Sequence, residues 1–257
     1  MVFDSSNRVY FIGAGPGDPR FLTLEGVRAL EKCHLVYALS PYPETFSSLL
    51  EAKLVKNPFD SVFSEITLEV EAALKRGSVG FLIPGDMTIF SPFLPLVERF
   101  GERSHVIAGV GILNAAAALL KKTLDMPEVS HSVVLTSPKH MDKYGDGSSL
   151  KALSRSAGTM ILYMVNRPLA ELMDELEPGF GPDAPVFIVY RIGLEGECLY
   201  RGTVSTIAQI VGDDDIFGHE SGKPSMAIVL IGNVLEAHAD PSFWDRRKEK
   251  FWDKRGE

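Results

Sequence analysis

The first half of the chain alternates short apolar runs with stretches in which apolar residues recur at helical spacing. Such runs, bounded by glycine, proline or polar residues, are typical of buried strands. Because they are continuous rather than alternating, they favour a parallel sheet covered on both faces. Strands are predicted over residues 9–12, 35–39, 79–83 and 105–107. Helices are predicted over residues 23–32, 46–52, 66–75, 91–100 and 112–122.

The second half has a more mixed pattern, and a break at Asp125-Met126-Pro127 precedes it. Strands are predicted over residues 133–135, 159–164, 185–190 and 226–231, a helix over 169–176, and a strand edge followed by a helix over 199–210. Polar loops are predicted at 142–149 and 212–225. We therefore predict an α/β fold of two α/β domains, with a mainly parallel sheet in residues 1–125 and a mixed sheet in 126–240. The charged tail, 241–257, is expected to be a solvated helix or a frayed end.

Three predicted strands of the first half end in turns that contain glycine. GAGPGDP stands at 13–19, PGDM at 84–87 and AGVG at 108–111. Glycine lets a ligand approach the backbone closely, and Pro16 and Pro19 stiffen the first loop. Since the carboxyl ends of parallel strands share one edge of the sheet, the loops are expected to converge on one ligand. These loops hold no lysine or arginine for a phosphate, so a neutral or cationic ligand is expected.

Two phosphate-binding motifs are excluded by their spacing. The dinucleotide fingerprint G-x-G-x-x-G would need glycine at position 18, where Asp18 stands, and an acidic residue after the second strand, where Ser40 stands. A Walker loop needs four residues between its glycines and Ser or Thr after the lysine. In GHESGK at 218–223 there are three, and Pro224 follows. We therefore expect no nicotinamide and no P-loop nucleotide.

Composition narrows the class of protein further. The 257 residues are 45% hydrophobic, enough for a sizeable core, and the net charge is −8. An acidic chain is a poor general nucleic-acid binder, because such binding depends on a basic face. No apolar run is long enough to span a membrane, and the first ten residues lack the apolar core of a signal peptide. Two distant cysteines and six scattered histidines predict reduced thiols in a cytoplasmic protein and no metal site.

Four stretches, taken together, resemble the tetrapyrrole methylases, which use S-adenosylmethionine to methylate porphyrinoid precursors. They are GAGPGDPRFLTLEG at 13–26, PGDMTIF at 84–90, AGVGILNAAAALL at 108–120 and VYRIGLEGECLYRGTVSTIAQIV at 189–211. The resemblance covers nearly the whole chain in the family's order. It implies a cofactor cleft between two α/β domains, a tetrapyrrole acceptor in corrin biosynthesis and a homodimer. Within the family, VYR…RGT is most similar to the precorrin-4 carbon-11 methyltransferases, while IFSPF is closer to the carbon-20 enzymes.

The resemblance also implies roles for individual residues. The positions that match cofactor-binding ones are Pro16, Pro84, Gly85, Asp86, Ile89, Gly111, Ile112, Met164, Tyr190, Arg191, Met226 and Ala227. Asp86 is expected to hold the ammonium group or the ribose of the cofactor. Gly17, Asp18, Arg155 and Arg167 are expected to contact the acceptor, with Arg191, Lys121, Lys139 and His140 as further cations for its carboxylates. From the residue types alone, Tyr163, Met164 and Met226 would equally suit simple core packing.

Some positions depart from the family pattern, and several functions stay open. Pro84 and Met87 stand in a loop that is commonly G-G-D-P in the family, and Gly111 and Ile112 replace positions that are often Ser or Thr. Methyl transfer from a sulfonium is an in-line displacement that needs positioning and desolvation but no metal, and no general base is evident. The alternatives are precorrin-2 or uroporphyrinogen III as acceptor, diphthine synthesis, ribosomal RNA methylation, or a non-catalytic member that binds a nucleoside-like ligand.

Overall fold

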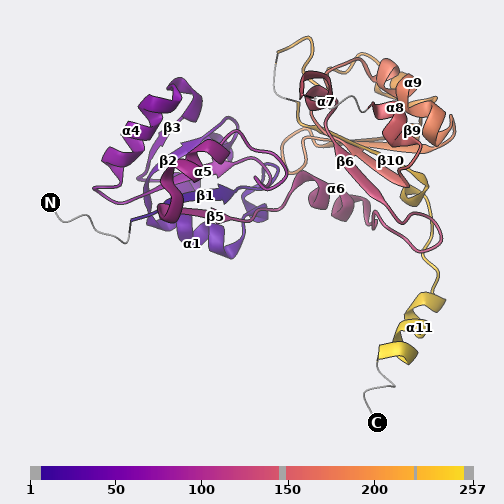
Figure 1. Ribbon diagram of the computed structural model, residues 1–257, viewed down its shortest axis with the longest axis horizontal. Coiled ribbons are helices and arrows are strands. Elements are labelled where there is room, and N and C mark those ends of the chain that lie inside the picture. Colours follow the sequence, from indigo (N-terminus) through magenta and orange to yellow (C-terminus); the bar gives the residue numbers. More distant parts are fainter. Residues whose placement is uncertain (1–6, 145–148, 223–224, 252–257) are drawn as a thin grey trace. The chain divides into compact units, whose positions relative to one another are not determined.

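The computed structural model describes residues 7–144, 149–222 and 225–251, whose path Figure 1 traces. The chain divides into two compact units. Unit 1 is Met1–Ala116 with Arg191–Cys198, and unit 2 is Ala117–Tyr190 with Leu199–Glu257. Within these described ranges the chain forms two five-stranded sheets, one parallel and one mixed. The predicted α/β fold with these two sheet types is thereby confirmed.

The sheet of unit 1 is parallel throughout, with the strand order β3-β2-β4-β1-β5. Its strands are β1 (Val9–Gly13), β2 (Cys33–Ala38), β3 (Leu54–Lys56), β4 (Ser78–Ile83) and β5 (Ser104–Ile107). Phe81 of β4 is the register partner of Phe11 on β1 and of Tyr37 on β2. Their rings stack on it with centroids 5.1 and 4.6 Å away, so the register itself builds the aromatic centre of this core.

Helices cover both faces of this sheet. α4 (Phe63–Ala73) and α5 (Leu94–Phe100) pack on the face that holds Phe11, whereas α1 (Leu24–Lys32), α2 (Tyr42–Thr45) and α3 (Ser47–Leu50) pack on the face that holds Ile12. Neighbouring residues of one strand therefore enter different clusters, as the period of two requires. Short 3-10 turns lie at η1 (Pro19–Phe21), η2 (Pro58–Asp60) and η3 (Gly101–Arg103).

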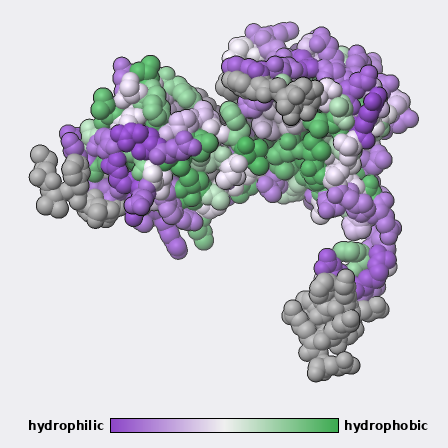
Figure 2. All heavy atoms as spheres, viewed as in Figure 1, coloured by the Kyte–Doolittle hydropathy of each residue, from purple (hydrophilic) through white to green (hydrophobic). Residues whose placement is uncertain are grey.

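The chain leaves unit 1 within α6 (Ile112–Leu120), a helix composed almost entirely of apolar residues. Figure 2 shows apolar surface where α6 lies. In its last turn, Leu119 is 42% exposed while Leu120 is buried.

The sheet of unit 2 has the order β6-β7-β10-β8-β9. Its strands are β6 (Val133–Thr136), β7 (Thr159–Leu162), β8 (Pro185–Tyr190), β9 (Cys198–Thr203) and β10 (Ala227–Ile231). β6 and β7 are parallel, while β10 runs antiparallel to both β7 and β8. The helices are α7 (Pro138–Tyr144), α8 (Leu150–Ser154), α9 (Leu169–Phe180), α10 (Ile207–Val211) and α11 (Ser242–Phe251), with a 3-10 turn η4 at Asn233–Leu235.

Several predicted elements differ from the observed ones. The helix predicted over 46–52 is the short helix α3, and α2, which precedes it, was not predicted. The helix predicted from Ser91 starts at Leu94, where Pro95 occupies the first turn. The strand β3 and the helix α8 were not predicted. The predicted loop at 142–149 overlaps α7 up to Tyr144, and its residues 145–148 lie outside the described residues.

Two further predicted segments are only partly described. The polar loop at 212–225 buries Ile216 and Phe217 in the core of unit 2, so it is packed rather than merely solvated. Its residues 223 and 224, which also close the rejected Walker pattern, lie outside the described residues. The predicted tail forms the helix α11 up to Phe251, and residues 252–257 lie outside the described residues.

Candidate functional site

The three glycine-containing turns of unit 1 lie together at one edge of its sheet. Gly15 and Gly85 form a two-bonded bridge, in which the N–H of Gly15 donates to Gly85 O at 3.1 Å and the N–H of Gly85 donates to Gly15 O at 2.8 Å. The N–H of Gly109 donates to Asp86 Oδ2 at 2.7 Å. The loops after β1, β4 and β5 therefore meet, as the parallel order of these strands predicts.

Glycine is required where these loops touch. A Cβ added to Gly109 would lie 2.3 Å from Gly85 O and 2.7 Å from Gly13 Cα, and one added to Gly13 would lie 2.5 Å from Gly109 Cα. Gly85 has a φ of +66°, a conformation that glycine adopts at little cost. The edge is thus built from backbone groups at distances that side chains would prevent.

Asp86 joins two of these loops through both of its oxygens. Oδ1 accepts from the N–H of Thr88 at 2.7 Å and from the Thr88 hydroxyl, and Oδ2 accepts from Gly109. Burial raises the pKa of Asp86, but the hydrogen bonds from Thr88 and Gly109 outweigh it and leave the pKa below its usual value. A charged carboxylate therefore stands at the carboxyl edge of the sheet, next to Gly85.

The other cofactor-binding positions predicted in the β4 loop are Pro84, Gly85 and Ile89, and they differ in solvent exposure. Pro84 is exposed and Gly85 is half-buried. Ile89 is 62% exposed, so it presents an apolar side chain that the core of unit 1 leaves uncovered. Gly111 and Ile112 are half-buried at the start of α6, and a Cβ on Gly111 would meet only ordinary contacts, 3.4 Å from Asn114 Oδ1.

The PGDP loop is buried and braced by a distant segment. Pro16 and Gly17 are buried, and a Cβ on Gly17 would lie 2.5 Å from Leu194 Cγ. Asp18 Oδ1 accepts from the N–H of Arg20 at 2.8 Å, and the Arg20 guanidinium holds the pKa of Asp18 below its usual value. Within unit 1, Gly17 therefore packs against Leu194 and Asp18 caps η1, and their contact with the acceptor stays a prediction.

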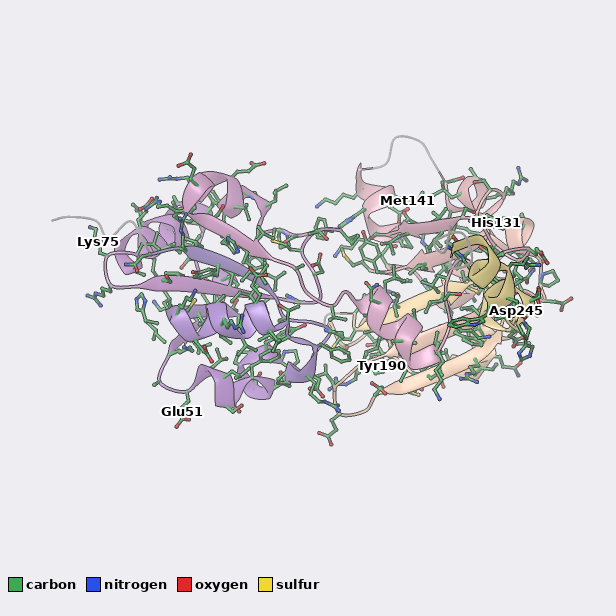
Figure 3. The ribbon with its side chains drawn as sticks, turned by 90° about the horizontal axis from the view of Figure 1, so that it is seen from below. Glu51, Lys75, His131, Met141, Tyr190 and Asp245 are labelled. Carbon is green, nitrogen blue, oxygen red and sulfur yellow. The ribbon has the colours of Figure 1, made fainter. Side chains whose placement is uncertain are left out.

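Four predicted residues of unit 2 gather at one edge of its sheet. Tyr190, labelled in Figure 3, ends β8 and is the register partner of Ala227 at the start of β10. Met226 directly precedes Ala227, and Met164 follows the end of β7, whose Leu162 pairs with Val229. The carboxyl ends of β7 and β8 thus meet the amino end of β10 at this edge.

In this region one predicted strand end is wrong, and one predicted acceptor residue lies apart from the others. Met164 was predicted to lie on a strand that runs to residue 164, but β7 ends at Leu162 and Met164 has a φ of +53°, which no strand residue adopts. Arg155 follows α8 and precedes β7, so it lies at the amino end of that strand, opposite the edge where Met164 lies. The structure therefore does not bring Arg155 together with the other predicted residues of unit 2.

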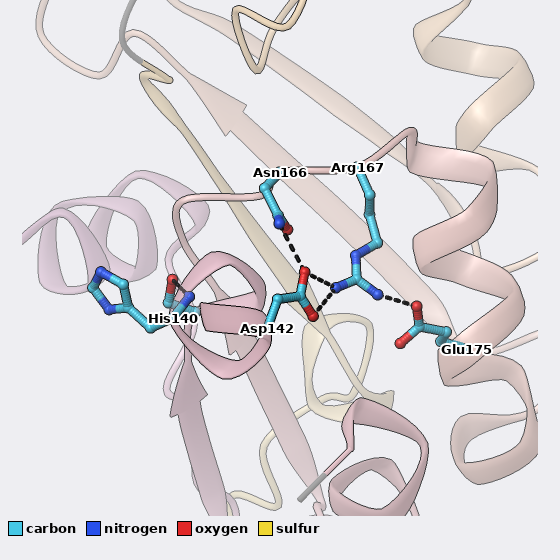
Figure 4. A network of polar contacts seen from close by, with 6 residues as sticks. His140, Asp142, Asn166, Arg167 and Glu175 are labelled. Carbon is cyan, nitrogen blue, oxygen red and sulfur yellow. Dashed lines mark hydrogen bonds and ion pairs between the residues drawn. The ribbon is translucent and has the colours of Figure 1, made fainter. Parts of the chain in front are cut away.

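Arg167 is already paired within unit 2 (Figure 4). Its Nη2 lies 2.6 Å from both oxygens of Asp142, its Nη1 pairs with Glu175, and Asn166 Nδ2 donates to Asp142 at 2.8 Å. With 18% of its side chain exposed, Arg167 forms these ion pairs within unit 2, and its contact with the acceptor stays a prediction. His140, drawn nearby, has a pKa held below its usual value by burial and by two neighbouring lysines.

The remaining predicted cations lie in varied surroundings. Arg191 belongs to unit 1, and its Nε donates to the carbonyl oxygen of Glu195 at 2.7 Å, so its side chain folds back on its own loop. Lys121 is exposed directly after α6, and Lys139 is exposed on α7.

Sequence reasoning missed four residues that hold these edges in place. Thr88 fixes Asp86, and its D-x-T spacing was a readable signal for such a turn. The hydroxyl of buried Tyr42 donates to Gly15 O at 2.7 Å, Asp142 pairs with Arg167, and His219 Nε2 lies 3.1 Å from Val165 O. These last three contacts join residues distant in sequence, so no local pattern announces them.

Among the described residues, no helix combines the length and the apolar character needed to cross a membrane. In the same part of the chain, His, Cys, Asp and Glu side chains form no group of three or more that could hold a metal ion.

Comparison with known proteins places the chain. The family model of the Tetrapyrrole (Corrin/Porphyrin) Methylases matches residues 8–208. The chain belongs to this family. A related tetrapyrrole methylase, the Precorrin-4 C(11)-methyltransferase of Pseudomonas aeruginosa, is 31% identical over 92% of this chain and 94% of its own length.

Solved structures show the same fold. A cobalt precorrin-4 methyltransferase, CbiF, described as a cobalamin biosynthetic enzyme, aligns with a TM-score of 0.78 at 22% identity, over 90% of this chain and 96% of that one. The uroporphyrin-III C-methyltransferase of Thermus thermophilus, complexed with S-adenosylhomocysteine, aligns with a TM-score of 0.68 at 23% identity, over 90% of this chain and 99% of that one.

Proposed function

We propose that this tetrapyrrole methylase transfers a methyl group from S-adenosylmethionine to carbon 11 of precorrin-4 or of its cobalt form. The observation that carries the choice of acceptor is the relative of that name in Pseudomonas aeruginosa, which is 31% identical over 92% of this chain. The VYR…RGT stretch at 189–211, which is most similar to this branch of the family, supports the same choice.

We propose the glycine edge of unit 1 as the place where the cofactor binds. The turns after β1, β4 and β5 pack directly against one another there through Gly13, Gly85 and Gly109, so a single ligand at this edge can meet all three turns. Asp86 supplies a negative charge in loops without lysine or arginine, which suits a cationic sulfonium or ammonium better than a phosphate. Exposed Ile89 offers an apolar contact for a nucleoside.

The residues at the edge of unit 2 complete the proposed cofactor set. Met164, Tyr190, Met226 and Ala227 lie at neighbouring strand ends, and the resemblance assigns matching positions to cofactor contact. Arg191 stays in the proposed cofactor-binding set, with its backbone as the contacting group, because its side chain is hydrogen-bonded to Glu195 O in its own loop.

The chemistry asks little of the protein beyond placement. S-adenosylmethionine supplies an activated methyl group, which leaves its sulfur as the acceptor carbon attacks from the opposite side. This chain's own residues hold the donor in line, and apolar side chains such as Ile89 exclude water from the reacting atoms.

Methyl transfer can be tested directly with four acceptors. The purified protein is incubated with methyl-labelled S-adenosylmethionine and uroporphyrinogen III, precorrin-2, precorrin-4 or cobalt-precorrin-4, and products are followed by mass spectrometry. Label in one of the last two supports the proposal. Label only in uroporphyrinogen III, the acceptor class named for the Thermus structure, or only in precorrin-2 reassigns the acceptor. Tight binding of S-adenosylhomocysteine without any transfer favours a non-catalytic member.

We also propose a cytoplasmic homodimer. The resemblance to the family supports the dimer, and the two distant cysteines agree with a reducing compartment. Native mass spectrometry of the purified protein gives the subunit count and any bound S-adenosyl species in one measurement. A monomer at micromolar concentration contradicts the dimer.

A further inference from the structure

The loop that joins β7 to α9 is held from three directions within unit 2. The N–H of Tyr163 donates to Thr136 O at the end of β6, at 3.2 Å. In the middle of the loop, His219 Nε2 lies 3.1 Å from Val165 O, and a carbonyl can only accept, so this nitrogen carries the proton. At its far end the loop is paired through Arg167.

This loop contains a backbone conformation that its sequence does not favour. Met164 has a φ of +53°, which lies in the left-handed region that is sterically unfavourable for an L-residue. Such a residue persists only where its surroundings over-determine it. Val165, its neighbour, is 4% exposed and anchors the loop in the core.

Arg167 connects the loop to two different helices. Its guanidinium bonds both oxygens of Asp142 on α7 and also pairs with Glu175 on α9, so one side chain ties the loop to two helices. Figure 4 shows the guanidinium between the two carboxylates, with Asn166 bonded to the first. Removing the Arg167 side chain, which is 18% exposed, would leave the carboxylates of Asp142 and Glu175, which are 49% and 36% exposed, without their shared cation.

We propose that Arg167 is a positioning residue for the nucleoside cofactor. It holds the β7–α9 loop in the shape in which Met164 has a positive φ, and it thereby sets the affinity for the cofactor without touching it. Without this anchor Met164 relaxes to an ordinary negative φ, and binding has to restore the unfavourable conformation. The inference rests on the proposed function, in which Met164 contacts the cofactor.

The test compares two arginine variants. Arg167→Ala is set against Arg103→Ala, which breaks a similar ion pair with Glu71, at 2.6 Å, in unit 1 and away from the proposed site. Calorimetry with S-adenosylhomocysteine should show a Kd raised about tenfold in Arg167→Ala, and unchanged within about twofold in Arg103→Ala. Arg167→Lys keeps the positive charge but loses the planar guanidinium that bonds two carboxylates at once. Its Kd should therefore lie between those of wild type and Arg167→Ala.

Two further readouts separate positioning from general destabilisation. Amide hydrogen exchange should become faster in the β7–α9 loop of Arg167→Ala and not in that of Arg103→Ala. In a Met164→Gly background, Arg167→Ala should raise the Kd only about twofold, since glycine adopts a positive φ without the anchor. Unchanged exchange, unchanged affinity, or an equal effect in both backgrounds overturns the proposal. Wild-type protein that does not bind S-adenosylhomocysteine instead overturns the proposed function, and the exchange data still report whether Arg167 holds the loop.

Discussion

At the scale of single residues, the candidate site depends on where a side chain is absent. Gly109 and Gly111 stand two positions apart, yet a Cβ would lie 2.3 Å from Gly85 O at the first and 3.4 Å from Asn114 at the second. The two glycines look alike in the sequence AGVG. What distinguishes them is that Gly109 lies directly against the backbone of Gly85 in the β4 loop, whereas Gly111 does not.

Alanine substitutions should separate these two glycines. Gly109→Ala should lower the free energy of unfolding by about 1–3 kcal/mol, because the loops after β1 and β4 must move apart. Gly111→Ala, the matched control, should change it by less than about 1 kcal/mol, since its contacts are ordinary and its φ is negative. Urea unfolding measures both, and equal effects would mean that the close approach at Gly109 is not rigid.

Asp86 carries the charge of this edge, and its pH dependence can be worked out. Because its folded-state pKa is below the ordinary value of 3.8, its stabilisation is present at neutral pH and is lost as the pH falls through the folded-state pKa. Asp86→Asn should therefore lower the free energy of unfolding by about 1–2 kcal/mol at neutral pH, through the lost charged hydrogen bonds.

Urea unfolding of Asp86→Asn and wild type across a pH series checks this prediction. The difference between the two proteins should stay constant from about pH 7 to 5 and shrink below about pH 4. A difference that already shrinks near neutral pH would show a raised pKa instead. Thr88→Val, which removes one donor to the same carboxylate, should give a smaller loss of the same kind.

At the scale of elements, α9 depends on a glycine in its last turn. A Cβ on Gly179 would lie 2.2 Å from Ser154 Oγ and 2.4 Å from the Ser154 carbonyl carbon, so α8 and α9 approach closely only because Gly179 has no side chain. Helix propensity alone predicts that Gly→Ala stabilises a helix by up to about 1 kcal/mol. At Gly179 the close contact with Ser154 outweighs this gain in helix propensity. Gly179→Ala should therefore lower the free energy of unfolding by about 1–3 kcal/mol.

Thermal unfolding of the Gly179→Ala variant decides between propensity and packing. A raised melting temperature would show that α8 shifts at no cost. As a reference for propensity, Ala170→Gly on an exposed position of the same helix should lower stability by about 1 kcal/mol.

Most strands could be predicted because burial on both faces leaves continuous apolar runs, as in β1, β4 and β8. β3 was missed because it has only three residues and lies at the edge of the sheet. Its residues are partly exposed there, so they do not form a continuous apolar run. Met164 was placed on a strand because Met and Tyr extend the apolar run past Leu162, and nothing local signals the turn. The paired state of Arg167 depends on Asp142 and Glu175, which only the fold brings to it.

At the scale of the whole molecule, unit 1 is completed by residues far along the chain. Arg191–Cys198 follow β8 of unit 2 and yet belong to unit 1. A Cβ on Gly193 would lie 2.9 Å from both Asp18 and Phe21, and Leu194 covers Gly17. The sequence GLEGE has no feature that announces this pairing, because both partners are short glycine turns without periodicity. The PGDP loop therefore takes its shape from a segment that sequence order places elsewhere.

Leu194→Ala tests whether this segment stabilises the first loop. The substitution removes the side chain that lies over Gly17, so amide hydrogen exchange of the PGDP loop should become faster while that of β8 and β10 stays unchanged. The free energy of unfolding should fall by about 1–2 kcal/mol, less than for a fully buried leucine, because Leu194 is only half-buried. Leu199→Ala, the matched control at a half-buried position of β9 in unit 2, should leave exchange in the PGDP loop at the wild-type rate. Faster exchange throughout unit 1 would instead mean that Arg191–Cys198 supports the whole sheet and not this one loop.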